Sequence, residues 1–232
     1  MCEYRLSRMS RVMAVVFMMG SLSVHAAVIP FSETFNSDAA NWRNTDGTAV
    51  VNWSATGGAG DDGGFVNTNF SFVDSAANDT PILFRGQDEF GSSGGAFVGD
   101  WVAGGANGFG AAVRHDADVP LNFFVRFAEP ANFPGANNVF FVPVESGTWT
   151  DLFAPLPNAS LIFEGPFTYE DVFDNIGHVQ IGVSVPASLA GADVNLQFGL
   201  DNVSIVPEPT TLALLVVGGL AAVVRGRRRV VA

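Results

Sequence analysis

Three stretches of this 232-residue chain alternate apolar residues with polar or small ones at a period of two. They lie at 119–127, 179–185 and 194–200. Successive side chains of a β-strand point to opposite faces, so this alternation is typical of strands with one buried face. Only 169–175 favours a helical turn. The pattern therefore predicts a domain built almost entirely from strands.

Other short apolar stretches are separated by clusters of Gly, Ser and Asp, which favour turns. The further strand candidates are 28–35, 50–55, 65–73, 82–85, 96–102, 109–114, 139–144 and 148–153. Many short strands without alternating helices are typical of an antiparallel β-sandwich, and we expect a jelly roll.

The last strand candidate changes phase near its end. Its apolar residues occupy even positions up to Leu200 and odd positions from Val203 onward. Such a change requires an extra residue or a bend in the strand. The polar pair Asp201–Asn202 lies at the change, so we predict a β-bulge there.

Residues 27–206 have the composition of an acidic folded domain. They carry 21 acidic residues, four arginines and no lysine, a net charge of −17. This charge disfavours nucleic acid, and it repels anionic polysaccharide unless cations intervene. The abundance of Phe, Val, Ile and Leu distinguishes the segment from disordered acidic chains, which lack apolar residues to bury. We expect one domain with a proper core.

The N-terminus has the pattern of a secretory signal peptide. Three arginines precede an apolar stretch at 12–22, and Val24 and Ala26 occupy the −3 and −1 positions of a cleavage site. The apolar stretch is short for a membrane span. We predict a signal peptide over 1–26, with a permanent N-terminal anchor as the alternative. The single cysteine, Cys2, lies within it, so the mature chain would have no disulfide.

The C-terminus combines three features in a fixed order. Val-Pro-Glu-Pro at 206–209 precedes an apolar run at 210–224, and an arginine-rich segment follows at 225–229. A helix over the apolar run would be about 22 Å long, short against a hydrocarbon core of about 30 Å. We predict a single transmembrane helix there, with its arginines cytoplasmic and the ectodomain at 27–205 outside. It would be a temporary anchor, or alternatively a plain single-pass one.

This ending resembles the PEP-CTERM sorting signal of Gram-negative, exopolysaccharide-producing bacteria. The resemblance implies recognition by an exosortase at the inner membrane, cleavage near the motif, and delivery to the outer surface or matrix. The alternative is a chance proline-rich linker before an anchor. The resemblance assigns the sorting role to Pro207, Glu208, Pro209, Arg225, Arg227, Arg228 and Arg229.

The ectodomain also resembles a known group of domains. The opening at 31–35 and the ending at 198–205 are similar to the first and last strands of laminin-B-like and carbohydrate-binding jelly rolls. The stretch 99–116 resembles ectodomains found in PEP-CTERM proteins. In the jelly rolls the first and last strands pair, and a structural Ca²⁺ often lies between them. The resemblance implies Glu33 and Asp201 as calcium ligands.

The pair Asp61–Asp62, in the glycine-rich loop 57–64, is a second possible metal site. It lacks the alternating ligand spacing of an EF-hand loop.

Four tryptophans are candidates for stacking on sugar rings. Trp42 and Trp101 neighbour polar and glycine-rich segments, so we expect them to be exposed ligand-binding residues, whereas Trp53 and Trp149 look like core. The alternative is that all four fill the sandwich core or its rim.

Catalysis has little support in the sequence. His115 and His178 are the histidines of the exported part, and no nucleophile elbow, metalloprotease motif or cysteine nucleophile accompanies them. We expect both histidines on surface loops and no enzymatic activity. The expected function is structural or adhesive, in contact with exopolysaccharide. A polysaccharide hydrolase using a carboxylate pair and an inert surface-layer component are the alternatives.

Overall fold

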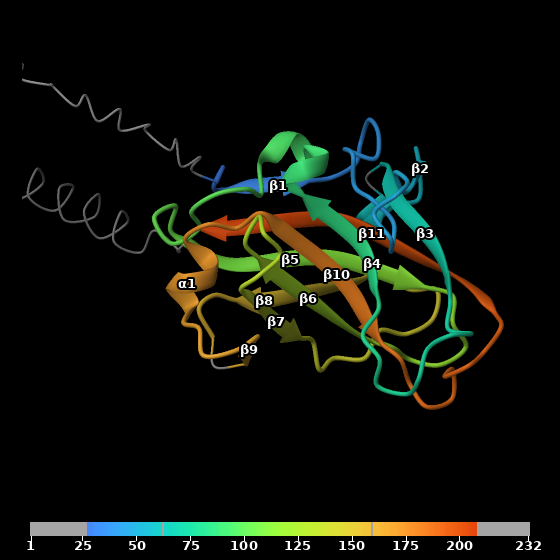
Figure 1. Cartoon of the computed structure of the whole chain (residues 1–232). Helices are drawn as coiled ribbons and strands as arrows, with labels where there is room; N and C mark the ends of the chain where they lie inside the picture. The colour runs from blue at the N-terminus through green and yellow to red at the C-terminus, as the bar shows by residue number, and fades with distance from the viewer. Residues whose placement is uncertain (1–26, 62, 159, 208–232) are drawn as a thin grey trace, which may run out of the picture.

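The computed structural model describes residues 27–61, 63–158 and 160–207, which form two antiparallel sheets packed face to face (Figure 1). The larger sheet contains β1 (Phe31–Glu33), β2 (Asn52–Ser54), β3 (Phe65–Ser71), β5 (Ala106–His115), β8 (Thr150–Pro155) and β11 (Asn195–Pro207). The smaller contains β4 (Ile82–Gln87), β6 (Asn122–Ala128), β7 (Gly135–Val139), β9 (Leu161–Phe163) and β10 (His178–Ser184). The predicted jelly-roll sandwich is confirmed.

Few helical residues accompany the sheets. The short helix α1 (Tyr169–Phe173) starts from a capping box, in which the Thr168 hydroxyl accepts from the Asp171 backbone N–H and the Asp171 carboxylate accepts in return. It occupies the segment predicted to form a helical turn. The 3₁₀ turns are η1 (Ala59–Asp61), η2 (Asp88–Phe90) and η3 (Ser92–Gly95).

Strand order shows how the chain crosses between layers. It is β2-β3-β11-β5-β8 in the larger sheet and β4-β10-β6-β7-β9 in the smaller. The long strand β11 pairs with β3 through 195–200 and with β1 through 203–205. The first and last described strands therefore pair, as the jelly-roll resemblance implied.

The predicted bulge in β11 is confirmed. Its register against β5 shifts between Asp201 and Ser204, and Asn202 has a φ of +49°. Leu200 and Val203 are both fully buried although they differ in parity. The extra residue lets both halves of β11 direct their apolar side chains into the same core.

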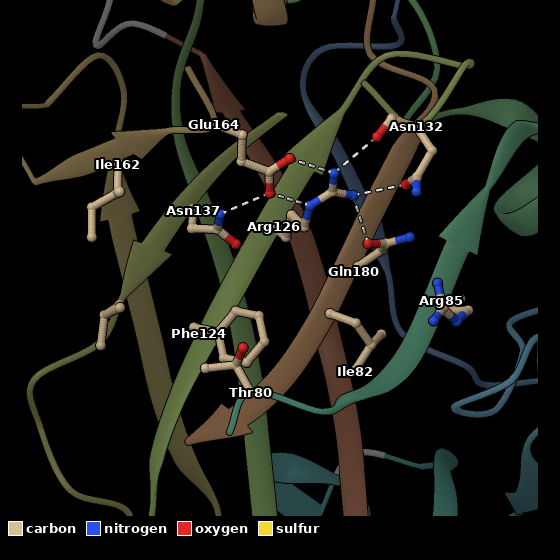
Figure 2. Close-up of a pocket in the computed structure, with 11 residues that line it drawn as sticks. Thr80, Ile82, Arg85, Phe124, Arg126, Asn132, Asn137, Ile162, Glu164 and Gln180 are labelled. Carbon is tan, nitrogen blue, oxygen red and sulfur yellow. Dashed lines mark hydrogen bonds and ion pairs between the residues drawn. The ribbon is translucent and has the colours of Figure 1, made fainter. Parts of the chain in front are cut away.

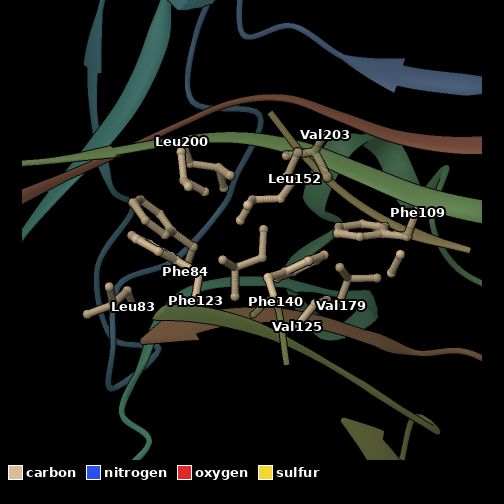
Figure 3. Packing of buried hydrophobic residues seen from close by; sticks show 14 of the residues in the cluster. Leu83, Phe84, Phe109, Phe123, Val125, Phe140, Leu152, Val179, Leu200 and Val203 are labelled. Atoms are coloured by element: carbon tan, nitrogen blue, oxygen red, sulfur yellow. The ribbon is translucent and has the colours of Figure 1, made fainter. Parts of the chain in front are cut away.

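The core fills the space between the sheets. Phenylalanines and aliphatic residues from both layers interdigitate, as Figure 3 shows for Leu200 above Phe84 and Phe123. Burying such side chains stabilises each by about 1.5–3 kcal/mol, before the entropic cost of ordering them. The apolar periodicity of the strands is what makes this layer continuous.

The expectation that Trp42 and Trp101 are exposed is wrong. Both have no accessible surface. The Trp42 ring packs edge-on against Phe35 and Phe97, and its Nε1 donates to the Ser93 hydroxyl. A buried indole cannot offer a face to a sugar, so neither tryptophan is a ligand-binding residue.

The prediction failed because the polar and glycine-rich segments beside Trp42 and Trp101 suggested that both rings lie at the surface. Glycine-rich turns bring the chain over the end of the sandwich, and the indoles fill the resulting space. The Trp101 ring contacts Phe109, Phe127 and Phe173. Conversely Trp53, expected in the core, is 40% exposed at the sandwich edge.

Two strand predictions were also wrong, and two strands were missed. Residues 96–102 form turns instead of a strand. The strand predicted at 139–144 overlaps an observed strand only at Val139, where β7 ends. Strands β7 and β9 were not predicted, because β7 begins with Gly-Ala-Asn-Asn and has little apolar character. Pairing with neighbouring strands outweighs weak local propensity here.

Several predictions fall outside the described residues. These are the signal peptide at 1–26, the transmembrane helix at 210–224, Glu208, Pro209 and the arginines of 225–229. Among the described residues, no helix has the length and apolar character needed to cross a bilayer.

Candidate ligand-binding cleft

A row of side chains crosses the outer face of the smaller sheet. Strand register places Arg85, Gln180, Arg126, Asn137 and Ile162 opposite one another on β4, β10, β6, β7 and β9. We call this the central row. It lies in a hollow of about 520 Å³ (Figure 2).

Beside the central row lies an apolar one. Ile82, Gly182, Phe124 and Val139 are register partners on β4, β10, β6 and β7. A Cβ added to Gly182 would lie 2.4 Å from the Phe124 ring, so this glycine makes room for the ring to lie across β10. The cleft floor therefore has a polar strip and an apolar strip side by side.

Arg126 organises the polar strip. Its Nε and one terminal nitrogen donate to the two oxygens of Glu164 at 2.5 and 2.7 Å. The terminal nitrogens also donate to Asn132 Oδ1, to the Asn132 carbonyl and to Gln180 Oε1. Figure 2 shows this network. Every donor group of the guanidinium thus has a partner within the protein.

Glu164 is held as an anion by this network. Its Oε1 also accepts from Asn137 Nδ2 at 3.0 Å. The hydrogen bond from Arg126 is the largest cause that lowers the pKa of Glu164, and the bond from Asn137 acts in the same direction. A carboxylate with such partners stays ionised at neutral pH.

Gln180 presents an unpartnered donor at the centre of the cleft. Its side chain is only 2% exposed, and its Nε2 has no hydrogen-bond partner. Because Oε1 accepts from Arg126, the amide orientation is set and Nε2 points away from Arg126 (Figure 2). A buried donor without a partner costs about 1–3 kcal/mol, and a ligand that accepts from it recovers this cost.

A second hollow of about 550 Å³ continues the cleft, since Arg85 and Asn132 line both. His178 lies in it, 5% exposed, with its Nε2 3.0 Å from the Pro130 carbonyl and Nδ1 unpartnered. Burial lowers the pKa of His178, so the ring is neutral at pH 7. Nε2–H then donates to the carbonyl and Nδ1 is a free acceptor.

The position of the histidines corrects the sequence prediction. Both lie buried in strands, not on surface loops: His115 in β5 with its Nε2 2.8 Å from the Val144 carbonyl, and His178 in β10. They belong to different sheets, so they do not form one site.

Oxygens converge where the predicted calcium ligand Asp201 lies. A Cβ added to Gly58 would lie 2.6 Å from Asp201 Oδ2, 2.7 Å from the Gly64 carbonyl and 3.1 Å from the Gly63 carbonyl. The Asp201 carboxylate, 3% exposed, also accepts from the Ala59 backbone N–H at 2.8 Å. The glycine-rich loop therefore packs carbonyl oxygens against a buried carboxylate.

Glu33, the other predicted ligand, lies on β1 opposite Val203, two residues beyond Asp201. Its Oε1 accepts from the Phe35 backbone N–H at 3.1 Å. In the part of the chain that the structure describes, no group of three or more His, Cys, Asp or Glu side chains could hold a metal. Of the alternative pair Asp61–Asp62, the second residue lies outside that part.

Comparison with known proteins agrees with the tail and the fold. Residues 206–229 match the PEP-CTERM protein-sorting motif. The motif confirms the resemblance found in the sequence, and it implies recognition by an exosortase. No curated protein matches the chain.

Solved structures that are similar to this chain include an exo-β-agarase at 10% identity and a TM-score of 0.50, over 76% of this chain and 24% of that one. The family 11 carbohydrate-binding module of a Clostridium thermocellum cellulase matches at 12% identity and a TM-score of 0.43, covering 78% and 96%. The L4b domain of human laminin α2 matches at 11% identity and a TM-score of 0.36, over 62% of this chain and 99% of that one. The chain spans about a quarter of the agarase chain. The agarase match agrees with the jelly-roll fold expected from the sequence, and it concerns the fold alone.

Proposed function

We propose that this chain is an exosortase-sorted surface protein whose sandwich binds carbohydrate in the cleft of the smaller sheet. The observation that carries the proposal is the pair of unpartnered, buried polar atoms in that cleft, Gln180 Nε2 and His178 Nδ1. One is a donor and the other an acceptor.

Carbohydrate fits this pair better than other ligands. Residues i and i+2 on one strand lie about 7 Å apart on the same face, a spacing that neighbouring hydroxyls of an oligosaccharide can span. A sugar hydroxyl both donates and accepts, so it can satisfy either atom. Ile82 and Val139, both partly exposed, offer an apolar surface for the C–H face of a ring, with the Phe124 ring, 4% exposed, lying between them.

The first hollow of the cleft supports binding in preference to hydrolysis. Glu164 is the acidic residue lining the first hollow, and both its oxygens accept from Arg126. Its lowered pKa makes it a poor general acid, because such an acid needs a raised pKa. We therefore propose a structural or adhesive role at the outer surface or in an exopolysaccharide matrix. The chain would first be anchored transiently in the inner membrane of a Gram-negative cell.

Titration calorimetry of the purified full chain with a panel of oligosaccharides tests the proposal. We expect binding that Gln180→Met weakens about tenfold, because a charge-neutral hydrogen bond and its buried donor are lost together. Gln197→Met is the matched control, since Gln197 is exposed on β11 in the other sheet. Absence of binding to every glycan, with or without calcium, would contradict the proposal.

A structural Ca²⁺ is a second part of the proposal. Asp201 and the carbonyls of Gly63 and Gly64 supply the hard oxygen donors that calcium prefers, and Glu33 on the paired strand would add another. The ion would fix the glycine-rich loop against β11.

Thermal melting in calcium and in chelator tests this part. At saturating calcium we expect Tm to rise by roughly 5–10 °C. Asp201→Asn should abolish the rise and Glu33→Gln should reduce it, whereas Asp193→Asn, an exposed residue of the loop before β11, should leave it unchanged. Equal melting temperatures of the unmodified chain in both buffers would remove calcium from the proposal.

A further inference from the structure

We propose that the cleft selects glycans that carry carboxylate groups, such as uronic acids, and that Arg85 together with Gln180 forms the seat for the carboxylate. The inference rests on the proposed function, since it names the class of glycan for the same cleft. It follows from an imbalance between donors and acceptors at the cleft floor.

The carboxylate and carbonyl oxygens that surround Arg126 are already in use. Glu164 accepts from Arg126 and Asn137, and Asn132 accepts from Arg126 through both its side chain and its carbonyl. Gln180 Oε1 accepts from Arg126 as well. Around Arg85 and Gln180 the floor therefore offers N–H to a ligand, whereas the free acceptor His178 Nδ1 lies in the second hollow.

Two donor groups without partners stand next to each other there. Gln180 and Arg85 are register partners on adjacent strands. Gln180 Nε2 has no partner. Arg85 donates a hydrogen bond through its Nε, and its terminal nitrogens make no hydrogen bond to any described residue. An acceptor-only group such as a carboxylate matches adjacent donors better than a hydroxyl does, because a hydroxyl must also place its own proton.

The Arg85 side chain is held in place for this role. Its Nε donates to the Thr45 carbonyl at 2.8 Å. Its backbone exchanges two hydrogen bonds with Arg43, at 3.0 and 2.9 Å. It lines both hollows and so lies where they join. A fixed guanidinium with free terminal nitrogens can bind a carboxylate with two parallel hydrogen bonds.

The charge of Arg85 is not neutralised by contact. Among the described residues, the ion pair closer than 4 Å is Arg126–Glu164. Asp46 and Glu89 influence Arg85 from a greater distance, and the Asp46 carboxylate accepts from the backbone and hydroxyl of Thr48. Partial burial is the largest cause that lowers the pKa of Arg85, and the nearby charge of Arg126 acts in the same direction. An anionic ligand would compensate that desolvation.

The net charge of the exported part opposes this preference only at long range. With −17 on residues 27–206, an anionic polymer is repelled as it approaches. At physiological salt this repulsion is screened beyond about 8 Å, whereas a contact pair in a partly buried cleft is screened much less. Discrimination is therefore local, and short oligosaccharides measure it best.

A pair of probes that differ only in charge tests the inference. Tetragalacturonate and its methyl ester share the same hydroxyl pattern, and each is titrated into the full chain at 0.15 M salt with a chelator present. We expect the acid to bind about 10–100 times more tightly, in line with a charge-assisted hydrogen-bond pair. Arg85→Gln should bring the two affinities within about threefold of each other, while Arg114→Gln, the same charge change on the other sheet, should preserve the preference.

Each alternative result has a distinct meaning. If acid and ester bind equally and Arg85→Gln changes neither, the inference is overturned and the proposed carbohydrate binding stands. A preference that appears only with calcium, and survives Arg85→Gln, overturns it in favour of cation bridging. A sulfated tetrasaccharide that binds as tightly as the acid overturns the choice of carboxylate. If no oligosaccharide binds, the proposed function fails as well. Melting curves of both variants establish that they are folded.

Discussion

Arg126 shows how one side chain can organise the floor of the proposed cleft through its bonds to neighbouring residues. All its donors are bonded to Glu164, Asn132 and Gln180, so it positions the cleft floor and leaves recognition to its neighbours. Removing it would leave the Glu164 carboxylate partly buried without its main partner. Such losses are dominated by the group left behind.

A double-mutant cycle at this pair measures that effect. We expect Arg126→Leu to lower the free energy of unfolding by about 2–3 kcal/mol, because it strands an anion. Glu164→Leu alone leaves the Arg126 cation without its carboxylate partner. The double variant should lose at least about 1 kcal/mol less free energy of unfolding than the sum of the two single losses. Urea denaturation gives the three values. Purely additive losses would mean that the pair is not coupled.

The buried histidines predict how stability depends on pH. Burial is the largest cause that lowers the pKa of both His115 and His178 below the ordinary value of 6.5. Near and below pH 6.5 the unfolded chain therefore binds more protons than the folded one, so stability falls as the pH drops.

Urea denaturation at several pH values between 7.5 and 5 checks this. Each histidine should contribute a slope of up to roughly 1.4 kcal/mol per pH unit. The double variant His115→Gln/His178→Gln should show a flatter profile over the same range. An unchanged profile would mean that these rings do not titrate on unfolding.

At the scale of elements, strand β10 is shaped by its glycine. Gly182 lies between Ile82 and Phe124 in the apolar row, and an added Cβ would meet both the Phe124 ring and the Pro81 carbonyl at 2.4 Å. Backbone cannot yield easily at such a distance, so the ring and the neighbouring chain would both have to shift. The shape of the cleft floor depends on this absence of a side chain.

We expect Gly182→Ala to lower the free energy of unfolding by about 1–3 kcal/mol and to weaken glycan binding. Ser184→Ala on the same face of β10 is the matched control and should change both by little. Thermal melting and calorimetry report the two effects. Unaltered binding by a folded Gly182→Ala variant would show that the Phe124 ring plays no part in the cleft.

The whole molecule couples a sorting tail to a rigid sandwich. The PEP-CTERM motif at 206–229 begins within β11, which contains Val206 and Pro207 and ends at the latter. Strand β11 pairs with β1, β3 and β5 and so carries the domain directly up to the motif. We expect changes in the tail to have little effect on the cleft, because the motif follows β11 of the larger sheet and the cleft lies on the smaller sheet.

Deleting 208–229 should abolish surface display while leaving glycan affinity within about twofold. Fractionation of the producing cells shows where the chain resides, and calorimetry of the purified variant reports binding. A milder substitution, Glu208→Ala, tests the motif itself, with Glu170→Ala on the exposed side of α1 as the control. Normal display of the truncated chain would contradict sorting by this tail.

The sequence by itself determined the class of fold and the bulge. Period-two alternation in 119–127 and 194–200 is a local property of strands, and the phase change at Asp201–Asn202 can be read without knowing any partner. The tail motif was also readable, because its three features are contiguous in the chain.

Only the tertiary structure decided the cleft and the roles of the tryptophans. Arg85, Gln180, Arg126 and Asn137 lie on four separate strands and come together through strand register, which alternation alone does not specify. Whether Trp42 lies in the core or on the surface depends on which turns cover it, since an indole suits either place. Contacts between distant segments set both outcomes, whereas local patterns set the strands.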